Sequence, residues 1–280
     1  MVNIGYHTAK VQGKLIRSLY QAGLSNILHL PILQAQKLPI IVYSFSCERD
    51  LPEQIASIRS FLHEVGIPNQ FIVISDGSYT NDSCNLIRQI HACVEVMHVD
   101  KLMRTDLPQY VYEFAAQHPL GKKFLALLSI PIQSTTIYTD SDILFFPGAT
   151  HLKELIASEQ RQPWYLTDCA CKVDEQVLFN EDERNNPVNS GFIILNQPLD
   201  WSLALERLSK KQTFNHYFTE QSLVHLTMHQ NCGQPLCPKL YVVSVKDQFI
   251  YPDKCVNKEV VLRHYVSDIR HKFWLKVKFK

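Results

Sequence analysis

The chain has 280 residues, which is enough for one large α/β domain or two small ones with a substantial buried core. Lys and Arg number 28 against 27 Asp and Glu, so the net charge of +1 excludes a general nucleic-acid-binding surface. No stretch approaches the ~18 consecutive apolar residues of a membrane-spanning helix, and Lys10, Lys14 and Arg17 interrupt any secretory signal. The 8 cysteines contain no C-x-x-C pair and predict no disulfide framework. We therefore expect a cytoplasmic protein.

The N-terminal part of the chain begins with a predicted helix and a predicted strand. Apolar residues at helical spacing predict a helix over 9–29, and an apolar, β-branched run predicts a strand over 39–46. Asp50 and Glu53 then have the spacing of a capping box, which predicts a second helix that ends at Gly66.

Strands and helices continue to alternate in the next segment. A strand over 71–75 runs into an Asp-Gly-Ser turn at 76–78, and a helix over 82–93 and a strand over 94–99 follow. Residues 108–128 read as a helix in two pieces. This alternation predicts a mainly parallel sheet that is covered by helices on both faces.

Two carboxylates interrupt the apolar run at 135–146. Residues two apart in an extended strand point to the same side, so Asp140 and Asp142 would face one ligand while Ser141 faces away. Paired carboxylates suit a hard divalent cation that also binds phosphate groups. A solvated turn that happens to hold two acids is the alternative, because D-x-D is a short motif.

Polar residues follow several predicted strands. Ser44, Ser46, Asp76 and the acids Asp140 and Asp142 all lie at the carboxyl ends of strands. In parallel sheets, ligands bind beyond these ends. We therefore expect these residues to border one crevice.

The second half of the chain is less regular. Its predicted elements are strands over 164–168, 188–196, 240–245 and 260–265 and helices over 201–208 and 217–229. Asn189, Ser190 and Gly191 open the second of these strands, and a glycine there lets another group approach the backbone closely. Glu220 and Gln221 lie near the start of the last helix.

The C-terminal segment is locally basic. Its cations are Arg263, Arg270, Lys272, Lys276, Lys278 and Lys280. Such a segment can contact phosphates or an anionic membrane surface, whereas a solvated tail is the simpler interpretation from Lys276 onward. Membrane contact would be peripheral at most.

The motifs Asp140-Ser141-Asp142 and Asn189-Ser190-Gly191 occur in this order along the chain. With both of them, the chain resembles the GT-A fold glycosyltransferases from about Pro39 to Trp274. The early half, with its Asp-Gly-Ser turn, is similar to family-2-like enzymes. The later half resembles family 8, and its matching residues are Asp140, Asp142, Asn189, Glu220, Gln221, His264 and Tyr265.

The resemblance implies one continuous GT-A domain, an α/β fold with a mainly parallel central sheet flanked by helices. Residues 1–38 would be a helical segment that precedes the two halves. Residues 39–146 would form the nucleotide-sugar-binding half that ends in the D-x-D motif. Residues 147–280 would form the half for the donor sugar and the acceptor, including the basic C-terminal segment.

The resemblance also implies a metal-dependent transferase of the hexosyltransferase type. Asp142 would be the main ligand of Mn²⁺ or Mg²⁺, Asp140 a ligand of metal or ribose, and His264 a third ligand. The donor would be a nucleotide sugar, with a UDP-sugar as the expected donor. Asp76 would accept a hydrogen bond from the base, and Ser44 and Ser46 would line its pocket. Further donor contacts are implied for Lys123, Ser141, Asn189, Ser190, Gly191, Arg270 and Lys272.

The C-terminal element departs from the family pattern. Family 8 enzymes follow the histidine with a Gly-containing Lys-Pro-Trp element that clamps the diphosphate. Here the run to Trp274 is two residues longer, lacks the glycine and has Phe273 in place of proline. This difference weakens the roles implied for His264 and Lys272 and makes His271 a competing ligand.

The catalytic assignments stay open between two stereochemical outcomes. An inverting enzyme needs a carboxylate base, for which Glu220 is the candidate; in a retaining enzyme, Glu220 and Gln221 would match the Asp-Gln pair and need no base. Asp168 is a further candidate near the donor sugar or the acceptor. The sequence does not specify the acceptor, which could be a glycan, a lipid-linked molecule, a small molecule or a protein. It also does not specify the oligomeric state.

Two other functions fit parts of the sequence. A GT-A protein that binds nucleotide sugars without turnover would explain the altered C-terminal element. A phosphohydrolase of the haloacid dehalogenase type also uses D-x-D, but on its first core strand, whereas here three predicted strands precede the motif.

Overall fold

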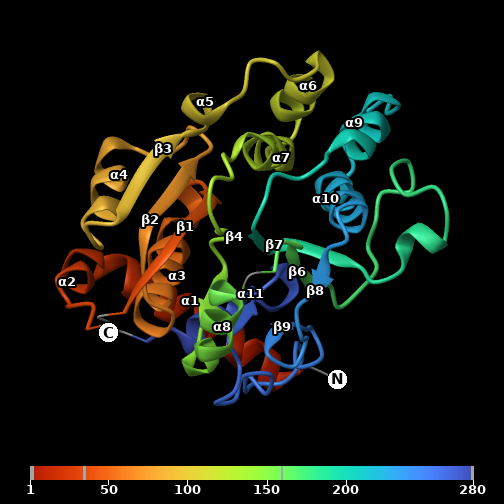
Figure 1. Ribbon diagram of the computed structural model, residues 1–280. Coiled ribbons are helices and arrows are strands. Elements are labelled where there is room, and N and C mark those ends of the chain that lie inside the picture. The colour runs from red at the N-terminus through yellow and green to blue at the C-terminus, as the bar shows by residue number, and fades with distance from the viewer. Residues whose placement is uncertain (1–2, 34–35, 159, 279–280) are drawn as a thin grey trace.

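A seven-stranded sheet lies at the centre of the protein and is flanked by helices (Figure 1). The structure, a computed structural model, describes residues 3–33, 36–158 and 160–278. In spatial order the strands are β3 (Val94–His98), β2 (Ile67–Ser75), β1 (Lys37–Ser46), β4 (Thr136–Thr139), β7 (Val188–Leu195), β6 (Trp164–Thr167) and β8 (Gln234–Pro235). Neighbours from β3 to β4 are parallel, and β7 runs antiparallel to β4 and β6. The predicted α/β fold with a mainly parallel sheet is confirmed.

The acid pair lies where the chain leaves this sheet. A second sheet contains three short strands, β5 (Ile143–Phe145), β10 (Leu262–His264) and β9 (Tyr241–Val243). The Asp140 amide donates to the Gly191 carbonyl in β7, whereas the Asp142 carbonyl accepts from the Tyr265 amide after β10. The prediction of one extended strand through both acids is therefore wrong. The chain turns here because its two flanks pair with different sheets.

Helices surround both sheets. They are α1 (Ile4–Ala22), α2 (Leu24–Leu28), α3 (Leu51–Glu64), α4 (Asn81–Arg88), α5 (Val99–Leu102), α6 (Gln109–Gln117), α7 (Pro119–Ser129), α8 (Thr150–Ala157), α9 (Ser202–Ser209), α10 (Thr219–Gln230) and α11 (Arg270–Lys276). Short 3₁₀ turns lie at Glu48–Asp50, Pro147–Ala149, Asp182–Arg184 and Ser267–Ile269. None of the helices in the described part of the chain has both the length and the apolar character needed to cross a bilayer.

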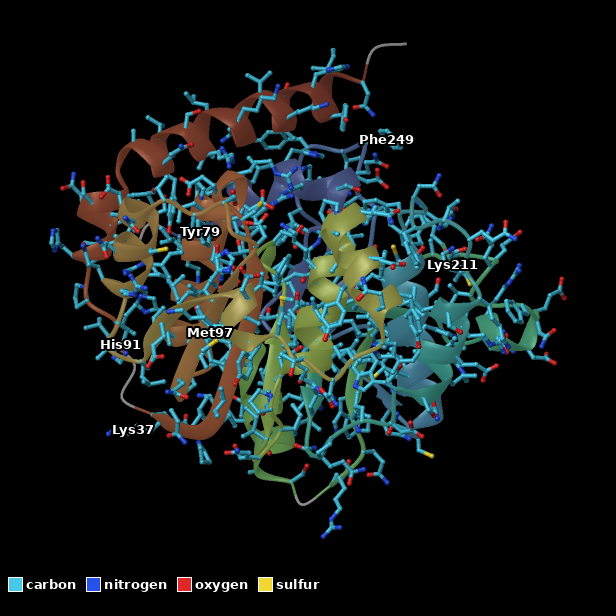
Figure 2. All side chains as sticks on the ribbon, turned by 90° about the horizontal axis from the view of Figure 1, so that it is seen from above. Lys37, Tyr79, His91, Met97, Lys211 and Phe249 are labelled. Carbon is cyan, nitrogen blue, oxygen red and sulfur yellow. The ribbon has the colours of Figure 1, made fainter. Side chains whose placement is uncertain are left out.

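Two helical predictions had different outcomes. The predicted break within 108–128 is confirmed between α6 and α7, where the His118 side chain accepts a hydrogen bond from the Leu120 amide at 3.1 Å. The predicted helix over 9–29 is instead two helices. Its first part, α1, ends at Gly23 and runs along the outer edge of the molecule (Figure 2).

Both faces of the large sheet are covered by apolar helix surfaces. On one face, Ile40 and Val42 of β1 belong to a buried cluster with Ile58 of α3. On the other face, Tyr43 belongs to a cluster with Leu127 of α7. Because a strand that is buried on both sides needs apolar residues at successive positions, the continuous run in β1 is explained.

The predicted capping box at α3 is wrong. Asp50 occupies the N-cap position, but its side chain makes no capping hydrogen bond. Its carboxylate pairs with Arg270 at 2.9 Å, while Glu53 pairs with Arg17 at 2.7 Å and accepts from the Trp274 indole at 3.1 Å. These acids therefore join α3 to α1 and to the C-terminal segment.

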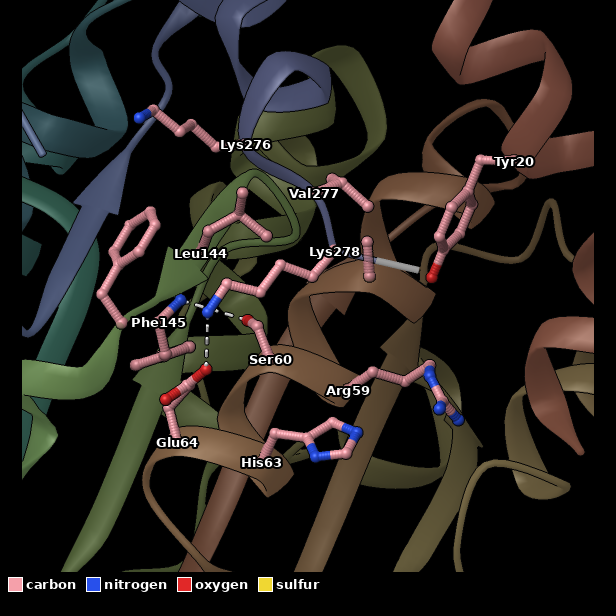
Figure 3. Close-up of a pocket in the computed structure, with 12 residues that line it drawn as sticks. Tyr20, Arg59, Ser60, His63, Glu64, Leu144, Phe145, Lys276, Val277 and Lys278 are labelled. Carbon is pink, nitrogen blue, oxygen red and sulfur yellow. Dashed lines mark hydrogen bonds and ion pairs between the residues drawn. The ribbon is translucent and has the colours of Figure 1, made fainter. Parts of the chain in front are cut away.

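A small cavity lies where the C-terminal segment meets α3 and β5 (Figure 3). Its volume of about 30 Å³ holds about one or two water molecules, so it is a packing gap. At its rim, Lys278 Nζ lies 3.3 Å from Glu64 Oε1, and Ser60 Oγ accepts from the Phe145 amide at 3.1 Å. Lys278 is thus tied to α3, which differs from the solvated tail that the sequence predicts. Lys280 lies outside the described residues.

A buried ion network supports the second sheet. Arg263 in β10 is fully buried and pairs with Asp247 at 2.7 Å and with Asp253, while Lys272 Nζ lies 3.1 Å from Asp247. Asp247, Asp253 and Cys255 lie close enough together to hold a metal ion. Because two protein cations already pair with these acids, the network does not resemble a metal site, and removal of either cation would leave a buried charge uncompensated.

The stability of the protein should depend on Asp247 in acid. Burial acts to raise the pKa of Asp247, but the hydrogen bond and charge of Arg263, with help from Lys272, lower it from 3.8 to about 2. The ionised carboxylate therefore stabilises the folded state above about pH 4, and this contribution is lost as the pH falls toward 2. We expect Asp247 to account for a loss on the order of 1 kcal/mol in unfolding free energy between about pH 5 and pH 3.

Urea denaturation at these two pH values measures the effect. The variant Asp247→Asn, which cannot titrate, should lose less stability than the native protein by this amount. Equal losses in both proteins would contradict the assignment.

Candidate active site

Two carboxylates and one imidazole converge at the turn between β4 and β5. His264 Nε2 lies 3.0 Å from Asp142 Oδ1 and 3.8 Å from Asp140 Oδ2. One oxygen from each acid and one ring nitrogen lie within 4.8 Å of one another. The acid side chains are 20% and 15% exposed, and Ser141 between them is buried. This set of oxygen and nitrogen donors can share one divalent cation.

Strand β7 fixes the ring of His264. Asn189 Oδ1 lies 2.8 Å from His264 Nδ1 and also accepts from the Gly191 amide at 3.0 Å. When Nδ1 carries the proton and donates to Asn189, the lone pair of Nε2 points toward the acids. A Cβ at Gly191 would lie 2.4 Å from the ring Cε1 and 2.5 Å from Nδ1. Glycine is therefore required for this close approach.

Lys123 of α7 links Asp140 to a second buried acid, Glu220. Its Nζ lies 3.0 Å from the Asp140 carboxylate and 3.7 Å from Glu220 Oε1. Ser190 Oγ accepts from Lys123 at 3.2 Å and donates to Glu220 Oε2 at 3.0 Å. The Tyr138 hydroxyl also donates to Asp140, at 2.7 Å. A continuous polar network therefore runs from the acid turn to the start of α10.

Burial and charge act in opposite directions on the pKa values of these groups. Burial acts to raise the pKa of Asp142, but the charge and hydrogen bond of His264 lower it to about 2. Burial lowers the pKa of His264, and Asp142 more than compensates, so the imidazole binds its proton more tightly than usual. The pKa of Lys123 is also raised, because Asp140 and Glu220 outweigh its burial. For Glu220 burial prevails over Lys123, and its pKa is raised.

These groups line a cavity of about 240 Å³. Another part of its lining contains Asp168, whose Oδ2 accepts from Gln221 Nε2 at 2.8 Å. Lys172 also borders the cavity and lies 6.0 Å from the centre of the Phe218 ring. No motif predicts a place in this site for Phe218, which immediately precedes α10, or for Lys172, which lies in an irregular segment.

The three residues predicted near the nucleotide base do not line the 240 Å³ cavity. Ser44 is fully buried, and its hydroxyl donates to Gln54 at 2.9 Å. Its predicted place in a ligand pocket therefore does not agree with the structure. Ser46 is buried and accepts from the Tyr79 hydroxyl at 2.8 Å. Asp76 follows β2 and lines a separate cavity of about 580 Å³.

The C-terminal candidates have partners other than those predicted, although the charge of Arg270 helps to lower the pKa of Asp142. Arg270 pairs with Asp50 at 2.9 Å. Lys272 is fully buried and donates to backbone carbonyls, so its predicted contact with a donor diphosphate does not agree with the structure. His271 packs against α1. Of the two histidine candidates, His264 is the one beside the acids.

Comparisons with known proteins identify the fold. No protein-family model matches the chain, and no curated protein matches it in sequence. Glycosyltransferase GlyE from Streptococcus pneumoniae TIGR4 is similar in structure, with a TM-score of 0.53, 13% identity and coverage of 87% of this chain and 62% of GlyE. Galactosyltransferase LgtC, in complex with donor and acceptor sugar analogues, gives a TM-score of 0.50 and 13% identity over 81% of this chain and 87% of LgtC.

A third structure, the bifunctional glycosyltransferase WbbM, has a TM-score of 0.50 and 11% identity over 85% of this chain. The chain has the GT-A glycosyltransferase fold. It spans about half the length of WbbM, of which 47% is covered. At these identities the likeness establishes the architecture alone.

The space at Gly191 allows a direct test of the site geometry. In Gly191→Ala, the added methyl group should displace His264 from Asp142, at a cost of about 1–3 kcal/mol in stability. Because the neighbouring acids raise the pKa of His264, that pKa should fall toward its usual 6.5 in the variant. Nuclear magnetic resonance titration of the assigned imidazole measures this change.

Gly23→Ala is the matched control. A Cβ there would meet its nearest atom at 3.3 Å, far from the site, so the His264 titration should be unaffected. An unchanged His264 titration in Gly191→Ala would show that the ring is not held as described.

Proposed function

We propose that the protein is a metal-dependent glycosyltransferase that moves a sugar from a nucleoside-diphosphate donor, a UDP-sugar, to a hydroxyl group of an acceptor. The observation that carries this proposal is the convergence of Asp140, Asp142 and His264 at the end of a central strand in a GT-A fold. In such sheets the carboxyl ends of the strands are where ligands bind. The fold does not favour the dehalogenase-type phosphohydrolase, because β4 is the fourth strand of the chain.

The residues present fit Mn²⁺ or Mg²⁺. Two carboxylates supply hard oxygen ligands, and the imidazole nitrogen of His264 favours Mn²⁺. The charge of the ion would replace that of the His264 proton, and Asn189 would keep the ring oriented. When bound, the metal ion would offset negative charge on the departing nucleoside diphosphate.

Two cavities offer places for the donor. Lys122 and Lys123 are consecutive residues of α7, and they line the 580 Å³ cavity and the 240 Å³ cavity respectively. Lys122 Nζ donates to the Asp76 carbonyl at 3.1 Å. We place the nucleoside toward Asp76 and the sugar in the smaller cavity, with the diphosphate between them near Asp140.

Glu220 is the candidate for the catalytic carboxylate. It is almost fully buried, and its Oε1 has no hydrogen-bond donor among the described residues. Its raised pKa would make it a better proton acceptor for an acceptor hydroxyl. In a retaining reaction, the same carboxylate would instead bind sugar hydroxyls beside Gln221. Both roles, as a base and as a ligand of sugar hydroxyls, require the negative charge of Glu220 within the cavity.

Nucleotide binding should depend on both Mn²⁺ and Asp142. With Mn²⁺ present, UDP at about 100 times its dissociation constant should stabilise the native protein by about 2.7 kcal/mol. Asp142→Asn should abolish the metal-dependent part of this effect, because it removes the ionised ligand beside His264. Thermal unfolding with UDP and Mn²⁺, added separately and together, measures the effect.

Asp82→Asn, at an exposed position of α4, is the control and should respond like the native protein. Indifference of the native protein to both additions would contradict the donor-site assignment.

Turnover should depend on the charge of Glu220. Glu220→Gln preserves the size of the side chain, so donor binding should persist while sugar release or transfer falls about 100-fold or more. Consumption of UDP-sugars with Mn²⁺ measures this loss, and the exposed Glu113→Gln should behave as the native protein does. Binding without turnover in the native protein would instead favour the non-catalytic alternative.

A further inference from the structure

Helix α1 exposes apolar side chains along one side. The residues and their exposed fractions are Ile4 77%, Val11 68%, Leu15 59% and Leu19 57%. At 3.6 residues per turn, these positions fall on one stripe of the helix. Aliphatic side chains this exposed and aligned are unfavourable in water, which indicates that another apolar phase covers them.

The opposite side of α1 is firmly packed. Ala9, Gly13 and Tyr20 are buried, and a Cβ at Gly13 would lie 2.3 Å from the His271 carbonyl oxygen. Tyr20 packs against Trp274 with ring centres 5.2 Å apart. These contacts fix the rotation of the helix, so the apolar stripe must face outward.

Charge on α1 is of one sign. The helix contains no acidic residue, and Lys10, Lys14 and Arg17 lie along one edge of the stripe. Arg17 is paired with Glu53, whereas Lys10 and Lys14 are exposed. An apolar stripe bordered by exposed lysines is the pattern of helices that lie in the interface of an anionic membrane.

Residues 249–251 form an exposed, mostly apolar segment beside the N-terminal end of α1. Phe249 lies beside the helix (Figure 2), with its ring centre 5.7 Å from that of Tyr6. Ile250 and Tyr251 follow and are also exposed, and the Tyr251 hydroxyl bonds to Gln12 of α1. Aromatic side chains with one polar end are favoured at the headgroup level of membranes.

We propose that the exposed side of α1, together with residues 249–251, docks the protein onto an anionic lipid surface. The alternative occupant, a second copy of the chain, is disfavoured by charge. A symmetric pair of α1 helices would bring Lys10 and Lys14 of two copies together with no acid on the helix to offset them. The proposal is independent of the transferase activity.

A groove of about 800 Å³ is lined by Lys10, Lys14 and other residues of α1. Ser267 and Asp268 line this groove and also the 240 Å³ site cavity. The lysine edge of α1 and the candidate active site therefore share two lining residues.

Vesicle co-sedimentation tests the proposal. The full chain should bind phosphatidylcholine vesicles that contain about one-third phosphatidylglycerol at least tenfold better than pure phosphatidylcholine vesicles, and salt should weaken the binding. Leu15→Ser with Leu19→Ser should reduce binding about tenfold or more, because apolar area is lost. Lys10→Gln with Lys14→Gln should reduce the preference for the anionic lipid.

Leu33→Ser is the matched control, since Leu33 is 83% exposed but lies outside α1. It should bind as the native protein does, and all variants should keep the native circular dichroism spectrum. Absence of binding to anionic vesicles, or equal loss in Leu33→Ser, would overturn the proposal. A dimer in light scattering that is lost in the Leu15/Leu19 variant would identify a second copy as the occupant and would also overturn it.

Discussion

Two carboxylates in a largely buried turn need positive charge nearby, and much of the structure follows from this requirement. Asp140 receives it from Lys123 of α7, and Asp142 receives it from His264 of β10. In the sequence, Lys123 precedes β4 and His264 follows it. Leaving either acid unpaired in such surroundings would cost several kcal/mol, so α7 and β10 have to be in place for the turn to be stable. The site and the fold therefore depend on the same interactions.

The turn also explains why two sheets are needed. One continuous strand would place both acids in the large sheet, where His264 could not reach them. Because β5 pairs with β10, the acid turn and His264 are brought to adjacent ends of a small second sheet. Strand β7 completes the arrangement, since Gly191 leaves space for the imidazole and Asn189 orients it. Gly191 and Asn189, at the start of β7, therefore contribute to the site in different ways.

The sequence predicts the large features of this fold well. The apolar runs of β1, β2 and β7 are long enough to be recognised, and the acid pair and Glu220 could be assigned to one site through the resemblance to GT-A enzymes. The very short β5 and β8 carry too little pattern to be found. The ligand contact implied for Lys272 rests on the resemblance to the family 8 Lys-Pro-Trp element, whereas its burial among carbonyl groups depends on tertiary packing. The placement of Ser44 also depends on tertiary packing, because the position of a serine near a strand end does not reveal which way its hydroxyl group points.

The pairing of β5 with β10 has a consequence for the synthesis of the protein. At about 5–20 residues per second, a ribosome makes Asp140 and Asp142 on the order of ten seconds before His264. During that interval β5 lacks its neighbour in the second sheet, and Asp142 lacks its imidazole. Lys123 is already present and can hold Asp140. The emerging chain thus carries an unfinished acid turn, and the cation-binding group is completed only when β10 joins β5.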